Sequence, residues 1–154
     1  MSTLTQPLSR AESLRDMKIG LFIPCYIDLV YPEVGIATLE LLERFGLDVD
    51  YPLTQTCCGQ PMSNSGDEAN AAAAERLFVE NFKPYDCIVG PAGSCVKQVR
   101  HHFDTIEQTD DVQHVRQNTF ELDDRSLINY TMMSSSILYF QRNTTGAALI
   151  SSKY

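Results

Sequence analysis

The sequence has no apolar run approaching the roughly 18 residues that a membrane-spanning helix needs, so no membrane span is expected. Its first 16 residues are polar and lack the apolar segment of a secretion signal, which predicts a cytoplasmic protein. Positive charge is scarce too: the chain has 12 Lys and Arg residues and 20 Asp and Glu residues, which gives a formal net charge of −8. This acidic balance argues against a general affinity for nucleic acid or for anionic membrane surfaces.

The chain also lacks any C-x-x-C pair, although it contains five cysteines. An odd number of cysteines without an export signal favours reduced thiols or thiolate ligands over a disulfide framework. Two of the cysteines are adjacent, Cys57 and Cys58, in the stretch TQTCCGQPMSNSG at residues 54–66. Gly59 and Pro61 argue against a strand or a helix through this point, so a tight loop is expected.

The remaining pattern predicts an α/β fold with a Rossmann-like three-layer arrangement, a short parallel sheet and crossover helices. Short apolar segments that favour buried strands lie at residues 17–25, 47–53 and 86–91. Helices are expected at residues 32–45, 67–82, 94–103 and 109–122. The strict alternation of strand and helix is the observation that favours parallel pairing.

The composition divides the chain into three parts. Residues 1–16 are expected to be a flexible leader, residues 17–122 a single cysteine-rich domain, and residues 123–154 an atypical tail. All 20 acidic residues lie in the first 124 positions, and the last 30 residues have none. This change of composition indicates that the tail is a separate segment.

Four of the five cysteines are expected to meet at one edge of the sheet. Cys25 closes the first strand, Cys57 and Cys58 lie in the loop after the second, and Cys95 follows the third. Parallel sheets bind ligands at the loops beyond the carboxyl ends of their strands, so these thiols should converge. Cys87 lies inside the third strand and is expected to be a small buried core residue.

Four thiolates at one edge can serve a zinc ion, an iron–sulfur cluster or thiol exchange, or the cysteines can simply pack. Zinc sites usually draw paired ligands from C-x-x-C, which is absent here. Adjacent cysteines bind one small ion with difficulty but can reach different irons of a multinuclear cluster. No Gly-x-Gly-x-x-Gly, Walker-type or Ser-His-Asp pattern is present, so nucleotide binding and hydrolysis have no support.

Three histidines are possible additional ligands, but each has a simpler interpretation. His101 and His102 lie near the end of an expected helix and should be exposed or capping. His114 lies in the polar stretch TDDVQHVRQ and should be solvated. Lys97 and Arg100 could offset thiolate charge, but a solvated helix face is the simpler interpretation here too.

The cysteine spacing also resembles that of a known family. Cys25, 31 intervening residues, Cys57-Cys58-Gly59 and then a Pro-x-x-x-Cys ending at Cys95 resemble the cysteine-rich CCG domain. That domain occurs in the cysteine-rich component of heterodisulfide reductase and in the iron–sulfur subunits of glycolate and lactate oxidation systems. The segments GLFIPCYIDLVYPEVGIATLELLERFGLDVDYPLTQTCCGQPMSNSG and VGPAGSCVKQV are most similar to the lactate utilization protein A type of iron–sulfur oxidoreductase. The resemblance covers about residues 17–122.

The resemblance implies an iron–sulfur electron-transfer component of an L-lactate oxidation complex, with no catalytic side chain of its own. It implies a cluster of the 4Fe-4S type held by Cys25, Cys57, Cys58 and Cys95, with zinc as the alternative metal. The implied partners are other iron–sulfur and lactate-utilization subunits.

The sequence departs from the family in two ways. The fullest form of the motif ends in C-x-x-C, and Ala92 stands where its first cysteine would be. Family members also carry a second CCG unit, which this chain lacks. Two further hypotheses therefore stand beside the first: a non-catalytic, metal-stabilised assembly module that binds zinc or an iron–sulfur cluster, and an inactive truncated form of the oxidoreductase.

Overall fold

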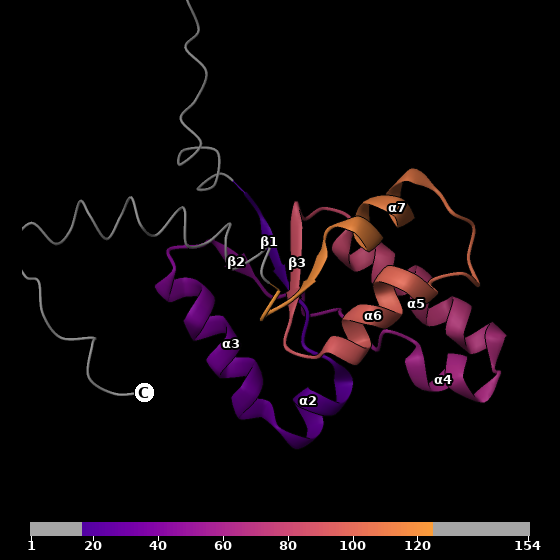
Figure 1. Cartoon of the computed structure of the whole chain (residues 1–154), viewed down its shortest axis with the longest axis horizontal. Coiled ribbons are helices and arrows are strands. Elements are labelled where there is room, and N and C mark those ends of the chain that lie inside the picture. The colour runs from indigo at the N-terminus through magenta and orange to yellow at the C-terminus, as the bar shows by residue number, and fades with distance from the viewer. Residues whose placement is uncertain (1–16, 125–154) are drawn as a thin grey trace, which may run out of the picture.

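Figure 1 shows the computed structural model of the chain, which describes residues 17–124. The expected leader, and the expected tail from residue 125 onward, lie outside the described residues. Four parallel strands form one sheet in the order β2-β1-β3-β4. Their bounds are β1 Ile19–Leu21, β2 Val49–Asp50, β3 Cys87–Gly90 and β4 Thr119–Glu121. This confirms the predicted α/β, Rossmann-like class.

Six helices accompany the sheet within the described residues. They are α2 Cys25–Val30, α3 Pro32–Arg44, α4 Gln60–Ser65, α5 Glu68–Phe82, α6 Gly93–His102 and α7 Asp110–Gln117. In Figure 1, α2 and α3 lie on one side of the sheet and α4 to α7 on the other. None of these helices combines the length and the apolar character needed to cross a membrane. The two helical layers bury the central strands β1 and β3 on both faces, and every residue of those strands is buried.

The first crossover follows the signals in its sequence. Helix α3 begins at Pro32, whose missing N–H costs nothing in the first turn of a helix. It ends before Gly46, which has a φ of 77° and so takes the left-handed conformation that glycine tolerates best. Its Thr38 and Leu42 are buried, and Gly35 lies against the side chain of Ile23. The apolar face of α3 thus packs on the end of β1.

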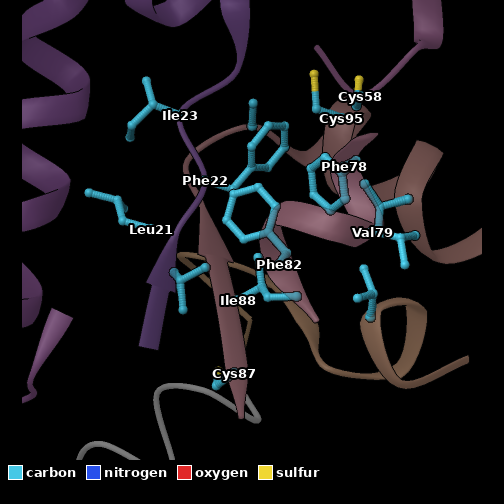
Figure 2. Close-up of a cluster of buried hydrophobic side chains, with 14 of the residues drawn as sticks. Leu21, Phe22, Ile23, Cys58, Phe78, Val79, Phe82, Cys87, Ile88 and Cys95 are labelled. Carbon is cyan, nitrogen blue, oxygen red and sulfur yellow. The ribbon is translucent and has the colours of Figure 1, made fainter. Parts of the chain in front are cut away.

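Phenylalanine rings fill the space between the sheet and α5 (Figure 2). Phe22 meets Phe78 with ring centroids 4.8 Å apart and an interplanar angle of 86°, an edge-to-face contact. Phe78 also contacts Phe82 at 4.5 Å and Phe103 at 5.5 Å. All four rings are completely buried. Edge-to-face pairs add to the burial of apolar area, so this cluster is the main source of stability on this face.

One expected helix is shorter than predicted, and the remainder of that segment is a strand. The helix expected over 109–122 ends at Gln117, and residues 119–121 instead form β4. Thr119 pairs with Ile88 and Phe120 with Val89, so both gain a place in the sheet. The prediction was wrong because pairing with β3 outweighs the helical tendency of the preceding residues.

Two segments expected to be strand or loop are helical. The first strand ends at Leu21 rather than at residue 25, and Cys25 begins α2. Pro61 was expected to prevent a helix, but α4 begins at Gln60, immediately after Gly59. Proline in the first turn loses no hydrogen bond, so it begins this helix instead of breaking it.

A buried carboxylic acid lies beneath the cysteine-bearing loop. Glu75 of α5 is fully buried, and its Oε2 accepts a hydrogen bond of 2.7 Å from the hydroxyl of Thr105. Its Oε1 has no hydrogen-bond partner among residues 17–124. Burial raises the pKa of Glu75 above the ordinary 4.5, and the hydrogen bonds from Thr105 oppose this only in part. The charged form of Glu75 is therefore a cost to the fold at neutral pH.

We expect Glu75→Gln to raise the free energy of unfolding at pH 7, by an amount of the order of 1 kcal/mol. An acid with a raised folded-state pKa stabilises the fold below its unfolded pKa and loses that contribution as the pH rises through the folded pKa. The advantage of the glutamine variant should therefore disappear as the pH falls towards 4.5. Urea unfolding between pH 4.5 and pH 8 measures this. Glu107→Gln, at an exposed carboxylate two residues after Thr105, is the control, and equal pH profiles for both variants would contradict the prediction.

Candidate metal centre

The structure brings all four candidate cysteines to the carboxyl-end edge of the sheet. Cys25 begins α2 just beyond β1, and Cys95 lies in the first turn of α6 just beyond β3. Cys57 and Cys58 lie in the loop between β2 and α4. The connection from β1 leads outward to β2, whereas that from β3 leads outward to β4 on the other side. The thiols therefore gather at the switch point between β1 and β3, where open α/β sheets form their ligand crevice.

The four thiols lie close enough to influence one another. The Sγ atoms of Cys25 and Cys57 are 3.5 Å apart. The thiols of Cys57 and Cys95 both shift the pKa of Cys58. Figure 2 shows the sulfur atoms of Cys58 and Cys95 side by side at one end of the phenylalanine core. All five cysteines are free thiols.

The contact between Cys58 and Cys95 distributes their protons unequally. The interaction with the Cys95 thiol, together with burial, raises the pKa of Cys58 well above its usual range. The same interaction lowers the pKa of Cys95, and Ser94 adds to this effect. Burial and the contact with Cys57 raise the pKa of Cys25. Cys95 is therefore the thiol of this pair that ionises first and is the better initial ligand.

Gly59 shapes the loop that carries the adjacent cysteines. It has a φ of 82°, a conformation that side chains on the α-carbon disfavour. A methyl group added there would also lie 3.4 Å from the Ala71 carbonyl oxygen of α5. The glycine therefore lets the chain turn sharply after Cys58 and lie directly on α5.

Gln55 attaches the same loop to β1. Its Oε1 accepts from the backbone N–H of Ile23 at 2.8 Å, and its Nε2 donates to the Leu21 carbonyl at 3.1 Å. The two bonds continue the pairing of β1 with its neighbour beyond the end of β2. They set the position of Cys57 and Cys58 relative to Cys25. Gln55 was not identified from the sequence, since nothing in the sequence distinguishes this glutamine from a solvated loop residue.

The site is open on one side only. Cys58 and Cys95 are 2% and 4% exposed, whereas Cys25 is exposed to solvent. Tyr26 lies beside the opening and is 42% exposed. Its phenol pKa is raised by burial and then by the nearby Cys95, Glu121, Cys25 and Cys58. The phenol therefore lies near Cys25, Cys58 and Cys95, a proximity that the sequence did not predict.

Within residues 17–124, no set of three or more His, Cys, Asp or Glu side chains is arranged around one point to hold a metal ion. The four candidate thiols nevertheless lie at one edge of the sheet. They are soft donors of the kind that zinc sites and iron–sulfur clusters both use.

Cys87 lies apart from the other cysteines, as predicted. It is 6% exposed and lies at the opposite end of β3 from the thiol group (Figure 2). Burial, with a smaller effect of Asp86, raises the pKa of its thiol to about 12. Cys87 is thus an inert core residue.

The histidines and Arg100 have structural or solvent-exposed positions. His101 and His102 are exposed, as expected. His114 is not simply solvated, because its Nε2 lies 2.8 Å from the Tyr85 carbonyl oxygen. Arg100 does not lie on a solvated face either: it donates to the Thr119 carbonyl at 3.2 Å and covers the ring of Phe120. The correction for Arg100 arises from contacts with β4, the strand that the sequence did not predict, and that for His114 from a contact with the residues before β3.

A comparison with known families accounts for this arrangement. The chain belongs to the cysteine-rich domain family called CCG, which matches residues 19–100. That range includes all three cysteine-bearing loops.

The curated relatives that match the chain are named lactate utilization protein A. Lactate utilization protein A of Geobacillus kaustophilus (strain HTA426) is 49% identical over 86 residues, covering 56% of this chain and 36% of the relative. Lactate utilization protein A 2 of Bacillus cereus (strain Q1) is 37% identical over 113 residues, covering 70% of this chain and 47% of the relative. The chain thus spans less than half the length of these relatives. No solved structure matches it.

Proposed function

We propose that this chain holds an iron–sulfur cluster and works as an electron-transfer component in L-lactate oxidation. The observation that carries the proposal is the group of four thiols at the switch point, with Cys25 and Cys57 in contact at 3.5 Å. The names of the relatives supply the link to lactate utilization. A bound cluster of the 4Fe-4S type would supply a one-electron relay.

The residues of the chain would hold and tune such a group. Cys25, Cys57, Cys58 and Cys95 are the proposed ligands. The backbone N–H of Tyr26 acts to lower the pKa of Cys25, and that of Gln60 acts to lower the pKa of Cys58, although burial and the neighbouring thiols outweigh both effects. Hydrogen bonds from backbone N–H groups stabilise the anionic form of a sulfur ligand and so adjust its redox behaviour.

The partners are proposed on the same basis. An electron relay needs a donor and an acceptor, and we propose that other iron–sulfur and lactate-utilization subunits fill these roles. The exposed Cys25 corner is the side on which such a partner would come close. We propose a cytoplasmic location, where the thiols stay reduced before the cluster is assembled.

Metal analysis of the protein purified without oxygen tests the cofactor. We expect iron and acid-labile sulfide in equal amounts, with a broad visible absorption that dithionite bleaches. Zinc without sulfide would instead support the metal-stabilised assembly module. If the protein contains neither zinc nor iron after reconstitution, both proposals are overturned. The inactive truncated form of the oxidoreductase is then the remaining hypothesis.

A second measurement tests the link to lactate. The cluster-loaded protein is incubated without oxygen in an extract of bacteria grown on L-lactate, which supplies the partner subunits. We expect L-lactate to bleach the visible absorption, and glycolate to leave it unchanged. Bleaching by glycolate alone would transfer the proposal to glycolate oxidation.

A further inference from the structure

The fourth strand places one more acidic group at the edge of the sheet that carries the cysteines. Glu121 is the last residue of β4 and pairs in register with Gly90 at the end of β3. The backbone N–H of Leu122 donates to the Gly90 carbonyl at 3.1 Å, which fixes this end of the strand. Each of the four strands therefore delivers a chemically active residue to the same edge.

The carboxylate of Glu121 lies against the first residue of α6. A methyl group added at Gly93 would lie 2.6 Å from both carboxylate oxygens, so this approach is possible only because residue 93 is glycine. Helix α6 has no acidic residue in its first turn, and its N-cap, Ala92, offers no side-chain hydrogen bond. The start of a helix carries a partial positive charge, so Glu121 supplies from β4 the negative charge that α6 itself lacks.

The same carboxylate is close to the thiols. Cys95 follows Gly93 by two residues in the first turn of α6. The Tyr26 phenol feels the charge of both Glu121 and Cys95, which agrees with the short path through Gly93 that links the carboxylate to the first turn of α6. A negative charge near the site opposes the gain of another negative charge there.

Resting on the proposed function, we propose that Glu121 is a positioning residue that sets the charge of the thiol site and lowers the reduction potential of the group held there. Glu121 takes up the favourable field at the start of α6, which would otherwise stabilise negative charge on Cys95. It also adds a negative charge beside a site that gains another when it accepts an electron. Both effects oppose reduction.

The experiment compares the cluster-loaded wild type with Glu121→Gln by redox titration, with dithionite as the one-electron donor. We expect the variant to keep its iron and sulfide and to be reduced about tenfold more easily, a shift of about +59 mV. Gly93→Ala should shift the potential in the same direction, because the added methyl group displaces the carboxylate and leaves its charge intact. Glu121→Asp keeps the charge and should remain nearer to the wild type.

Asp110→Asn is the matched control, because it removes an exposed carboxylate from the start of α7, a helix that carries no cysteine. A potential for Glu121→Gln equal to that of this control would overturn the proposal. Loss of iron and sulfide from Glu121→Gln would also overturn it, because the residue would then be needed for assembly.

A second measurement does not need the cluster. In the metal-free protein, the Glu121 carboxylate should slow the reaction of Cys25 with the dianionic reagent dithiobisnitrobenzoate. Glu121→Gln should therefore speed this reaction at least about twofold, and should leave the reaction with neutral dithiodipyridine unchanged. If the wild type assembles no cluster, the proposed function fails. The proposal for the charge of Glu121 is then supported if Glu121→Gln speeds only the reaction with dithiobisnitrobenzoate. It is overturned if the variant changes the reactions with both reagents equally.

Discussion

Replacing Cys58 by serine is expected to remove the cluster. The variant should retain less than about a tenth of the iron and sulfide of the wild type, since even the outer partners of metal ligands are worth 10- to 100-fold in affinity. Cys58 interacts with the thiols of both Cys57 and Cys95. Its loss therefore removes these interactions as well as one ligand. Iron and sulfide analysis after anaerobic reconstitution measures the effect.

Two further variants separate the loss of a ligand from the loss of the fold. Cys87→Ser changes a buried cysteine at the other end of β3, and it should keep the iron of the wild type despite some loss of stability. Cys25→Ser changes an exposed thiol, so the fold should stay intact while the iron is lost. Full iron content in Cys25→Ser and Cys58→Ser together would show that the cysteines merely pack.

Truncation of Phe78 is expected to have the largest effect on stability. Phe78→Ala should lower the free energy of unfolding by about 3–5 kcal/mol, the range for large aromatic residues removed from a core. Phe78 is completely buried and contacts Phe22, Phe82 and Phe103, so its loss leaves a cavity that no neighbour can fill alone. Urea unfolding monitored by circular dichroism of the metal-free protein gives the value.

The adjacent residue provides the control. Leu77 is on the same turn of α5 but is 46% exposed, so Leu77→Ala should change stability by no more than about 0.5 kcal/mol. Both variants place alanine, the best helix former, in α5, so a loss of stability reports lost packing and not lost helicity. A similar loss in both would mean that the ring cluster has no special weight.

Local periodicity was enough to predict the part of the fold that places the cysteines. The apolar runs around Ile19 and Ile88 are strands buried on both faces, and such strands are parallel when helices separate them. Once the strands are parallel, residues that follow them must lie at one edge. The convergence of Cys25, Cys58 and Cys95 therefore follows from topology without any knowledge of side-chain contacts.

The parts that were missed depend on contacts between distant segments. Thr119 and Phe120 form a strand because β3 offers a free edge, which no local pattern reveals. Gln55 matters because its amide meets β1, and Glu121 because Gly93 leaves room for its carboxylate. In each case the residue type is ordinary, and only the neighbour that the fold brings to it gives it a role.

Among the four thiols, Cys25 is the one that is exposed, so it sets the side from which other molecules reach the site. In the proposed relay, electrons would pass efficiently only over short distances, so the corner where Cys25 meets solvent would be the place for exchange with a partner. Dioxygen would reach a bound cluster through the same corner, because Cys58 and Cys95 are buried in the core. Fast electron exchange and sensitivity to air would therefore go together. A partner that covers the Cys25 corner would both exchange electrons with the site and keep dioxygen away from it.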